Sequence, residues 1–181
     1  MATGSLIKID EEIVTSAVAS VTLGGANWDS SYDVYVVRLN GIESDDTTAN
    51  RYLYGRVLTS GTAQTDANYD YASKGLWANG GFQNNYVTNS TFWYISGSAM
   101  NGVETQGKES LNAVLYLFNF NNASEYSFIT EETGTLNGDG QLYGGQGGGV
   151  KTTAEANNGM QFLFSGGNIR TGSAVLYGLK K

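Results

Sequence analysis

Cysteine, histidine and proline are all missing from the 181 residues of this sequence. Without cysteine there is no disulfide and no thiolate nucleophile, so the fold does not depend on an oxidising compartment. Without histidine the chain lacks the commonest general base and metal ligand, which excludes a Ser-His-Asp or Cys-His centre and a histidine-ligated zinc site. We therefore expect a non-enzymatic protein with no catalytic residues, no metal and no cofactor.

Positive charge is also scarce, because 10 Lys and Arg residues stand against 17 Asp and Glu residues, for a formal net charge of −7. This balance argues against nucleic acid and against an anionic membrane as partners. No apolar run approaches the roughly 18 residues of a transmembrane helix. The first residues lack the basic and apolar regions of a signal peptide, so we expect a protein made in a cytoplasm.

Glycine and tyrosine are abundant, with 25 and 12 copies. Tyrosine and β-branched residues favour strands, whereas glycine and asparagine favour turns. Apolar residues alternate with period 2 in residues 6–9, 17–23, 32–39, 52–58, 92–95, 112–120, 126–130, 160–164 and 174–179. In the strongest of these runs Val114, Tyr116, Phe118 and Phe120 line one face, and Ala113, Leu115 and Leu117 line the other.

These patterns predict eight to ten strands with no linker between them. We expect one all-β domain over residues 1–181, a two-sheet antiparallel β-sandwich of jelly-roll or Greek-key type. Helix is expected only in short pieces at residues 10–16 and 152–157.

Two glycine-rich stretches lead to specific predictions. The GGQGGG run at residues 144–149 is not followed by Lys-Ser or Lys-Thr, so it is not a phosphate loop, and it predicts a surface loop packed close to a neighbour. The turn at residues 166–168 predicts a terminal hairpin that joins residues 162–165 to residues 173–179. If its second strand lies inside a sheet, deleting residues 173–181 should leave unfolded or aggregated protein.

Acidic side chains occur in three loop-like stretches that could hold a hard cation such as calcium. These residues are Glu43, Asp45, Asp46, Asp66, Asp70 and Asp139. None of the stretches has the spacing of an EF-hand loop, so solvated turns are the expected structure. Glycoside hydrolysis needs two carboxylates at a fixed separation, and no pair is singled out by the sequence.

Three tryptophans offer flat apolar surfaces that could stack on sugar rings. Trp93 lies in a strand-like run and is expected in the core. Trp28 and Trp77 lie in loop-like stretches, so they are candidates for surface contacts with a glycan or a partner protein. Ordinary packing or an oligomer contact is the competing interpretation.

Six motifs follow one another along the chain: VTLGG, SSYDVYVVRLNGI, LTSGTAQTDANYDYA, LYLFNFNNASEYSFIT, the block from GGQGGGVKTT to SGGNI, and the closing TGSAVLYGLKK. In this order they resemble small virion structural proteins of marine tailed bacteriophages. The resemblance covers nearly the whole chain. Its more specific marks are NASEYSFI and the closing Gly166-Gly167-Asn168-Ile169, Gly172 and Leu176-Tyr177-Gly178-Leu179. It implies a β-sandwich component of a phage particle and carries no catalytic motif.

Three functions are then open. The first is a capsid decoration or cement protein that stabilises the outer shell, with the major capsid protein or other virion proteins as partners and a homo-oligomeric state such as a trimer. The second is a tail-fibre or appendage module that binds host glycans. The third is a small glycan depolymerase that would rely on carboxylates and tyrosines. The first is the expected one, which would place the protein in the virion.

Overall fold

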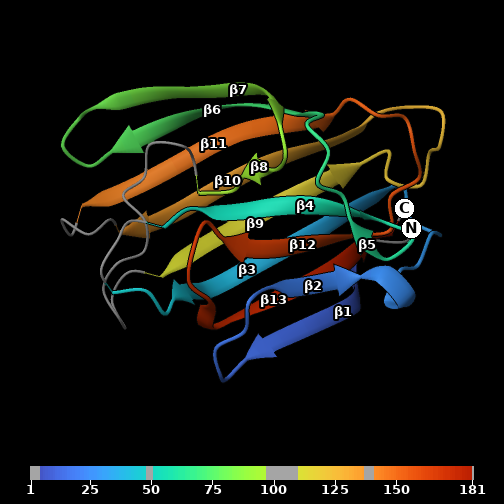
Figure 1. The fold of residues 1–181 in the computed structure, drawn as a ribbon, viewed down its shortest axis with the longest axis horizontal. Helices are drawn as coiled ribbons and strands as arrows, with labels where there is room; N and C mark the ends of the chain where they lie inside the picture. Colours follow the sequence, from blue (N-terminus) through green and yellow to red (C-terminus); the bar gives the residue numbers. More distant parts are fainter. Residues whose placement is uncertain (1–4, 48–50, 97–109, 137–140, 181) are drawn as a thin grey trace.

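In a computed structural model, which describes residues 5–47, 51–96, 110–136 and 141–180, the chain is almost entirely β-structure. Two antiparallel sheets pack face to face, as Figure 1 shows, so the predicted all-β sandwich is confirmed. The described residues form thirteen strands, more than the eight to ten expected. Their helical structure is limited to one 3-10 turn, η1 (Gly25–Asn27).

The larger sheet contains eight of the described strands. Their order is β1 (Leu6–Val14), β13 (Ile169–Leu179), β3 (Val34–Ser44), β9 (Leu111–Phe118), β10 (Ser127–Leu136), β11 (Leu142–Lys151), β6 (Tyr69–Trp77) and β7 (Phe82–Ser90). β1 and β7 are therefore its two edges.

The smaller sheet covers one face of the larger one. Its order is β2 (Val21–Gly24), β12 (Gly159–Phe164), β4 (Leu53–Thr59) and β5 (Thr62–Ala63), with β8 (Trp93–Tyr94) also paired to β4. β2 lies against β1 and β13, and β8 lies against β6. The smaller sheet therefore spans most of the width of the larger one and stops short of β7.

The core lies between the sheets and follows the predicted alternation. In β9 the side chains of Leu111, Ala113, Leu115 and Leu117 are buried, whereas those between them face outward. Trp93 is fully buried, as expected. Phe120 departs from the pattern. It is also fully buried, because Asn119 adopts a positive φ of 61° just after β9 and redirects the chain.

The glycine-rich residues 144–149 form part of strand β11, so the predicted surface loop is wrong. Glycine is needed there because large side chains from neighbouring strands cover its inner face. A Cβ on Gly149 would lie 2.5 Å from the Trp93 indole, and one on Gly145 would lie 2.5 Å from Oγ1 of Thr133. A Cβ on Gly75, in the next strand, would lie 2.5 Å from the Tyr143 ring.

The predicted terminal hairpin is also wrong, because β12 and β13 belong to different sheets. β12 pairs with β2 and β4, whereas β13 pairs with β1 and β3. The turn at residues 166–168 is an arch between the sheets. Asp45 holds it, since its carboxylate accepts hydrogen bonds from the backbone N–H and the side-chain amide of Asn168 at 2.7 and 2.8 Å. The expectation that residues 173–179 lie inside a sheet is confirmed.

Both predicted helices are absent. Residues 10–14 belong to β1, and residues 152–157 form an irregular connection from β11 to β12. The hairpin of β6 and β7 was not predicted as a pair of strands.

Candidate functional site

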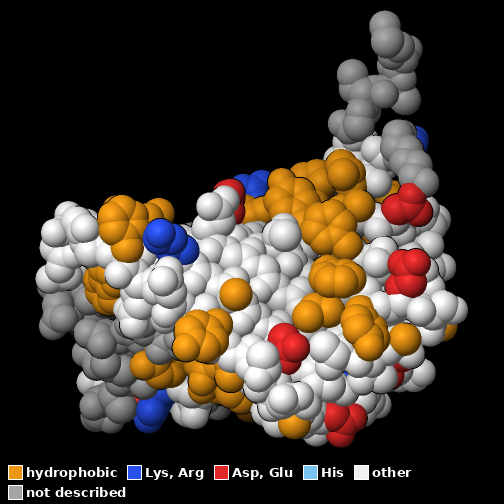
Figure 2. All heavy atoms as spheres, turned by 90° about the horizontal axis from the view of Figure 1, so that it is seen from above, with side chains coloured by type: hydrophobic (Ala, Val, Ile, Leu, Met, Phe, Trp, Pro, Cys, Tyr) orange, Lys and Arg blue, Asp and Glu red, His pale blue; other side chains and the backbone are white. Residues whose placement is uncertain are grey.

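The outer face of the larger sheet, the one turned away from the smaller sheet, carries many exposed apolar side chains. They include Tyr116 on β9, Phe128 on β10 and Tyr86 on β7. Figure 2, which views the molecule from the β7 side of Figure 1, shows hydrophobic side chains gathered in clusters with charged side chains around them. Such patches on a soluble protein mark surfaces that contact other molecules.

A shallow groove of about 510 Å³ crosses this outer face, and we call it the outer groove. Its floor is low because Gly148 on β11 and Ala72 on β6 lie opposite each other in the strand register. Tyr86, opposite Ala72, and Phe128 on β10 form its walls, with exposed fractions of 80% and 42%. The lining is almost wholly apolar, so the outer groove suits an apolar side chain of a partner.

A second apolar patch lies at the other end of the same strands. Leu136 and Leu142 are opposite each other, and Leu76 and Phe82 continue the patch onto β6 and β7. A polar row of Glu132, Gln146 and Lys74 lies between the patch and the outer groove. This row places Glu132 and Lys74 between the two apolar areas, and Asp70 is the acidic residue that lines the outer groove itself.

On the inner face Glu131 is buried among uncharged groups. It lies opposite Gly147, which in turn lies opposite Ser73. Within the described part of the chain, Oε2 of Glu131 and Oγ of Ser73 have no hydrogen-bond partner. Burial raises the pKa of Glu131 well above its usual range, and burial together with the nearby Glu131 raises the pKa of Tyr143 to about 12. Burial therefore favours the uncharged form of both side chains.

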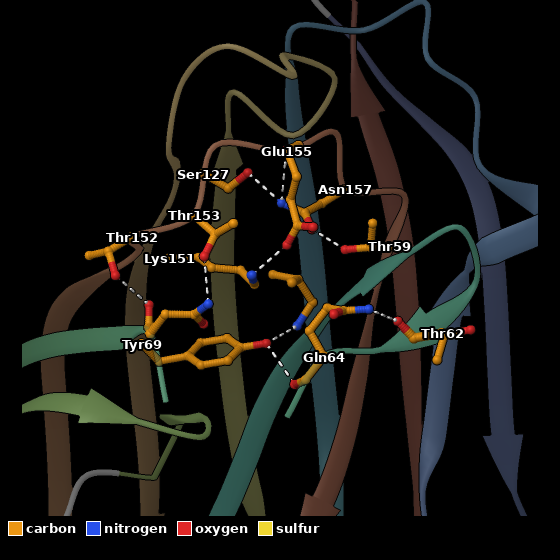
Figure 3. A network of polar contacts seen from close by, with 12 residues as sticks. Thr59, Thr62, Gln64, Tyr69, Ser127, Lys151, Thr152, Thr153, Glu155 and Asn157 are labelled. Carbon is orange, nitrogen blue, oxygen red and sulfur yellow. Dashed lines mark hydrogen bonds and ion pairs between the residues drawn. The ribbon is translucent and has the colours of Figure 1, made fainter. Parts of the chain in front are cut away.

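Figure 3 shows a polar network at one end of the sandwich. Lys151, at the end of β11, has a side chain that is 1% exposed, and its ammonium group forms an ion pair with Glu155. The same ammonium lies 5.7 Å from the centre of the Tyr69 ring. The Tyr69 hydroxyl donates a hydrogen bond to the Gln64 carbonyl at 2.9 Å, and burial raises its pKa.

The network continues through Asn157, whose side-chain amide donates to Oγ of Ser127 at 2.8 Å and accepts from Oγ1 of Thr59 at 3.0 Å. These contacts fix the irregular residues 152–157 against β4, β6 and β10. The functional groups are bonded to one another rather than directed at a cavity, so the network has a structural role.

The loop carboxylates of the sequence analysis do not converge. Glu43 pairs with Arg170, Asp46 with Arg51, and Asp45 with Asn168. Asp70 lies on β6 and accepts a hydrogen bond from the backbone of Asn89, whereas Asp139 lies outside the described residues. Among the residues that the structure describes, no group of three acidic, cysteine or histidine side chains could hold a metal ion.

Trp28 and Trp77 both pack against other aromatic rings. The Trp28 ring centre lies 3.9 Å from that of Tyr35, and its indole N–H donates to Asn121 at 2.8 Å. The Trp77 ring meets the Tyr143 ring edge-on at 5.1 Å. Trp28 lies near the start of β10, because its partner Asn121 follows the end of β9, which pairs with the start of β10. Trp77 lies near the end of β10, because its partner Tyr143 is opposite Thr135. The two indoles are therefore on the order of 20 Å apart along the strands.

Compared with known proteins, the chain matches no protein-family model and no curated protein sequence. None of the helical structure in the described residues is long and apolar enough to cross a membrane.

Sequence reasoning missed the residues that shape the outer groove. Ala72 and Tyr86 lie in runs whose alternation is diluted by asparagine and glycine, and Gly148 lies in a run assigned to a loop. The signal that could have identified them is the turn at residues 79–81, flanked on both sides by alternating residues.

Proposed function

We propose that this chain is a non-enzymatic structural component of a tailed-phage virion. Its role is that of a capsid decoration or cement protein, which covers contacts between capsid subunits and stabilises the outer shell. Its partner is the major capsid protein, and it docks through the outer face of its larger sheet. The resemblance of the sequence to phage virion proteins supports the virion as its location. The exposed apolar side chains on the outer face of the larger sheet support this face as the docking surface.

The observation that carries this proposal is the outer groove with its two aromatic walls. A tyrosine and a phenylalanine beside a floor of alanine and glycine can bury an apolar side chain with little loss of conformational entropy. Many identical copies on a symmetric shell make even weak contacts durable, because each attached copy keeps its neighbours close to their own sites.

The buried polar groups support a structural role. A working acid–base pair needs two titratable groups within reach of a substrate. Glu131 is enclosed, and Oε2 of its carboxyl has no hydrogen-bond partner among the described residues. Lys151 is enclosed as well and paired with Glu155. Both groups therefore lack the access to substrate that catalysis requires.

A glycan-binding appendage would need aromatic faces gathered on one exposed surface. Trp28 and Trp77 lie near opposite ends of β10 and pack against neighbouring rings. This separation favours capsid attachment over the appendage.

The test is a sedimentation assay with the purified chain and capsid shells of the encoding phage that lack it. We expect the wild type to sediment with the shells, and the Phe128→Asp variant to lose binding at least about tenfold, because a charge in the groove loses solvent on docking. Ile13→Asp is the matched control, since Ile13 is an exposed apolar residue on β1 outside the groove. Unfolding temperatures confirm that both variants are folded.

Attachment of the wild type to isolated tails alone would contradict a capsid role. Binding of Phe128→Asp at the wild-type level would show that the outer groove is not the docking surface.

A further inference from the structure

The two edges of the larger sheet differ in how they are protected from pairing with another strand. β1 carries Lys8, Asp10, Glu11 and Glu12, and its register is broken by a bulge between Lys8 and Asp10. Charges and bulges are the usual devices that keep an edge strand from pairing. β7, with the sequence FQNNYVTNS, contains no charged residue, and the whole chain contains no proline. Its own register break lies near its end, between Val87 and Ser90, where Asn89 has a positive φ of 56°.

β7 is long and open. It spans nine residues and is paired with β6 on one side, and Figure 1 shows no described element beyond it at the rim of the molecule. In an antiparallel strand about half of the backbone N–H and C=O groups point to each side. Within the described part of the chain, the outward half of these groups on β7 has no strand partner and can bond a strand of another molecule.

We infer that β7 pairs antiparallel with β7 of a second copy of this chain, so that two larger sheets join into one continuous sheet around a two-fold axis. This inference goes beyond the proposed function, because it concerns the free protein as well as any assembly. We expect the partner to be a second copy because β7 can pair antiparallel with an identical strand in a matching register and brings no charged residue to the contact.

The register follows from geometry. Residues that lie directly opposite each other in a sheet point to the same face. The two-fold axis must therefore lie midway between one residue and the same residue of the second copy. Tyr86 is the central residue of β7, and an axis there pairs residues 84–88 of one copy with the same residues of the other, short of the irregularity at Asn89. Tyr86 then lies opposite its own copy, and Asn84 lies opposite Thr88 of the second copy.

Exposure points to the same residue. Tyr86 is 80% exposed, the largest exposed fraction among the large hydrophobic side chains of the described residues. Opposite tyrosines on one face of a sheet stabilise the pair of strands. The joined strands would thus cover the side chain that the monomer leaves most open to water.

Charge favours this edge over the rest of the surface. Two copies that each carry a formal charge of −7 repel each other, and the repulsion is least where the contact itself is uncharged. β7 supplies such a contact, whereas β1 would bring three carboxylates of each copy to the joint.

Cysteine cross-linking tests the register directly, because the natural chain has no cysteine. Opposite residues have Cα atoms about 4.5–5.5 Å apart, within the range that a disulfide spans. Under mild oxidation Tyr86→Cys should form a covalent dimer by itself. Asn84→Cys and Thr88→Cys should each stay single and should cross-link when mixed. Tyr116→Cys, on the interior strand β9, is the control that should not cross-link.

Charge exchange tests the same contact without a covalent bond, by sedimentation equilibrium over a range of concentrations. The wild type should be a dimer, and Tyr86→Lys and Tyr86→Glu should each raise the dimer dissociation constant about tenfold or more, because like charges lie opposite each other. An equimolar mixture of the two variants should restore dimers. Tyr116→Lys should behave as the wild type.

A wild type that is monomeric at all concentrations, a trimer, or equal cross-linking of all four cysteine variants would overturn the inference. Tyr86 also forms one wall of the outer groove, so capsid attachment is tested separately, by Phe128→Asp on β10, three strands from this edge.

Discussion

Glycine residues of β11 make room on the inner face for the large side chains that cover them. Gly149 lies beneath the Trp93 indole, which donates toward the carbonyl groups of Asp70 and Val150 at 3.3 and 3.4 Å. Any larger residue at these positions would displace a ring that bridges the two sheets. Close packing of this kind makes a protein sensitive to the addition of a single methyl group.

We expect Gly149→Ala to lower the free energy of unfolding by about 1–3 kcal/mol, because its Cβ has no space beside Trp93. The measurement is chemical denaturation followed by tryptophan fluorescence. Gly144→Ala is the matched control. Its Cβ would meet its nearest atom at an ordinary 3.9 Å, so stability should change little. Equal effects at the two positions would show that backbone freedom, not packing, decides the outcome.

Glu131 gives stability an unusual dependence on pH. Its folded-state pKa is raised by burial, so the native protein keeps a proton that the unfolded chain loses at lower pH. The contribution of this group is therefore fully present below its unfolded pKa and is lost as the pH rises toward its folded pKa. One such group changes stability by at most about 1.4 kcal/mol per pH unit.

We expect Glu131→Gln to reduce this loss of stability between about pH 5 and pH 7, because an amide does not titrate. Free energies of unfolding measured at several pH values provide the test. Glu132→Gln is the control, since Glu132 is the next residue of β10 and lies on the opposite, exposed face. Unchanged pH slopes in Glu131→Gln would mean that Glu131 is charged in the native protein.

At the scale of strands, the sequence predicts those with clear alternation and misses those rich in glycine or asparagine. β9 and β12 alternate strictly and are found where they were predicted. β11 was missed because most of its inner face is glycine, which leaves no apolar alternation in the sequence. The space that side chains would occupy there is filled by Tyr143, Trp93 and Ser73. The alternation of β7 is equally diluted, so the outer groove and the β7 edge were missed, and only the turn at residues 79–81 indicates a hairpin there.

Which strands are neighbours could not be predicted at all, because alternation defines faces and not partners. The arch at residues 166–168 looks like a hairpin turn in the sequence. It crosses between sheets because Asp45, distant along the chain, binds Asn168. A contact over 123 positions leaves no local signal.

β13 is the strand whose loss should matter most, because it is the partner of both β1 and β3. We expect a chain without residues 173–181 to be unfolded or aggregated, since β3 would become a bare edge above an open core. Circular dichroism during heating gives the readout. A chain without residues 1–4, which precede β1, should keep the cooperative transition of the wild type. A soluble truncated chain that melts cooperatively would show that β13 is dispensable.

As a whole molecule, the protein is a sandwich of unequal sheets, eight strands against five in the described residues. The smaller sheet covers most of one face of the larger sheet, and the other face carries the outer groove. The β7 edge carries no charged residue. A body with an enclosed interior and an open apolar face is suited to binding large partners. That arrangement, together with the resemblance to phage virion proteins, leads to the proposed role on a capsid.

The most direct measurement is a cryo-electron microscopy map of the intact tailed-phage particle to which the proposal assigns this chain. The account requires density for a two-sheet body on the outside of the shell, with the outer groove facing a capsid subunit. Density confined to the tail, or a body that meets the shell through its smaller sheet, would contradict it.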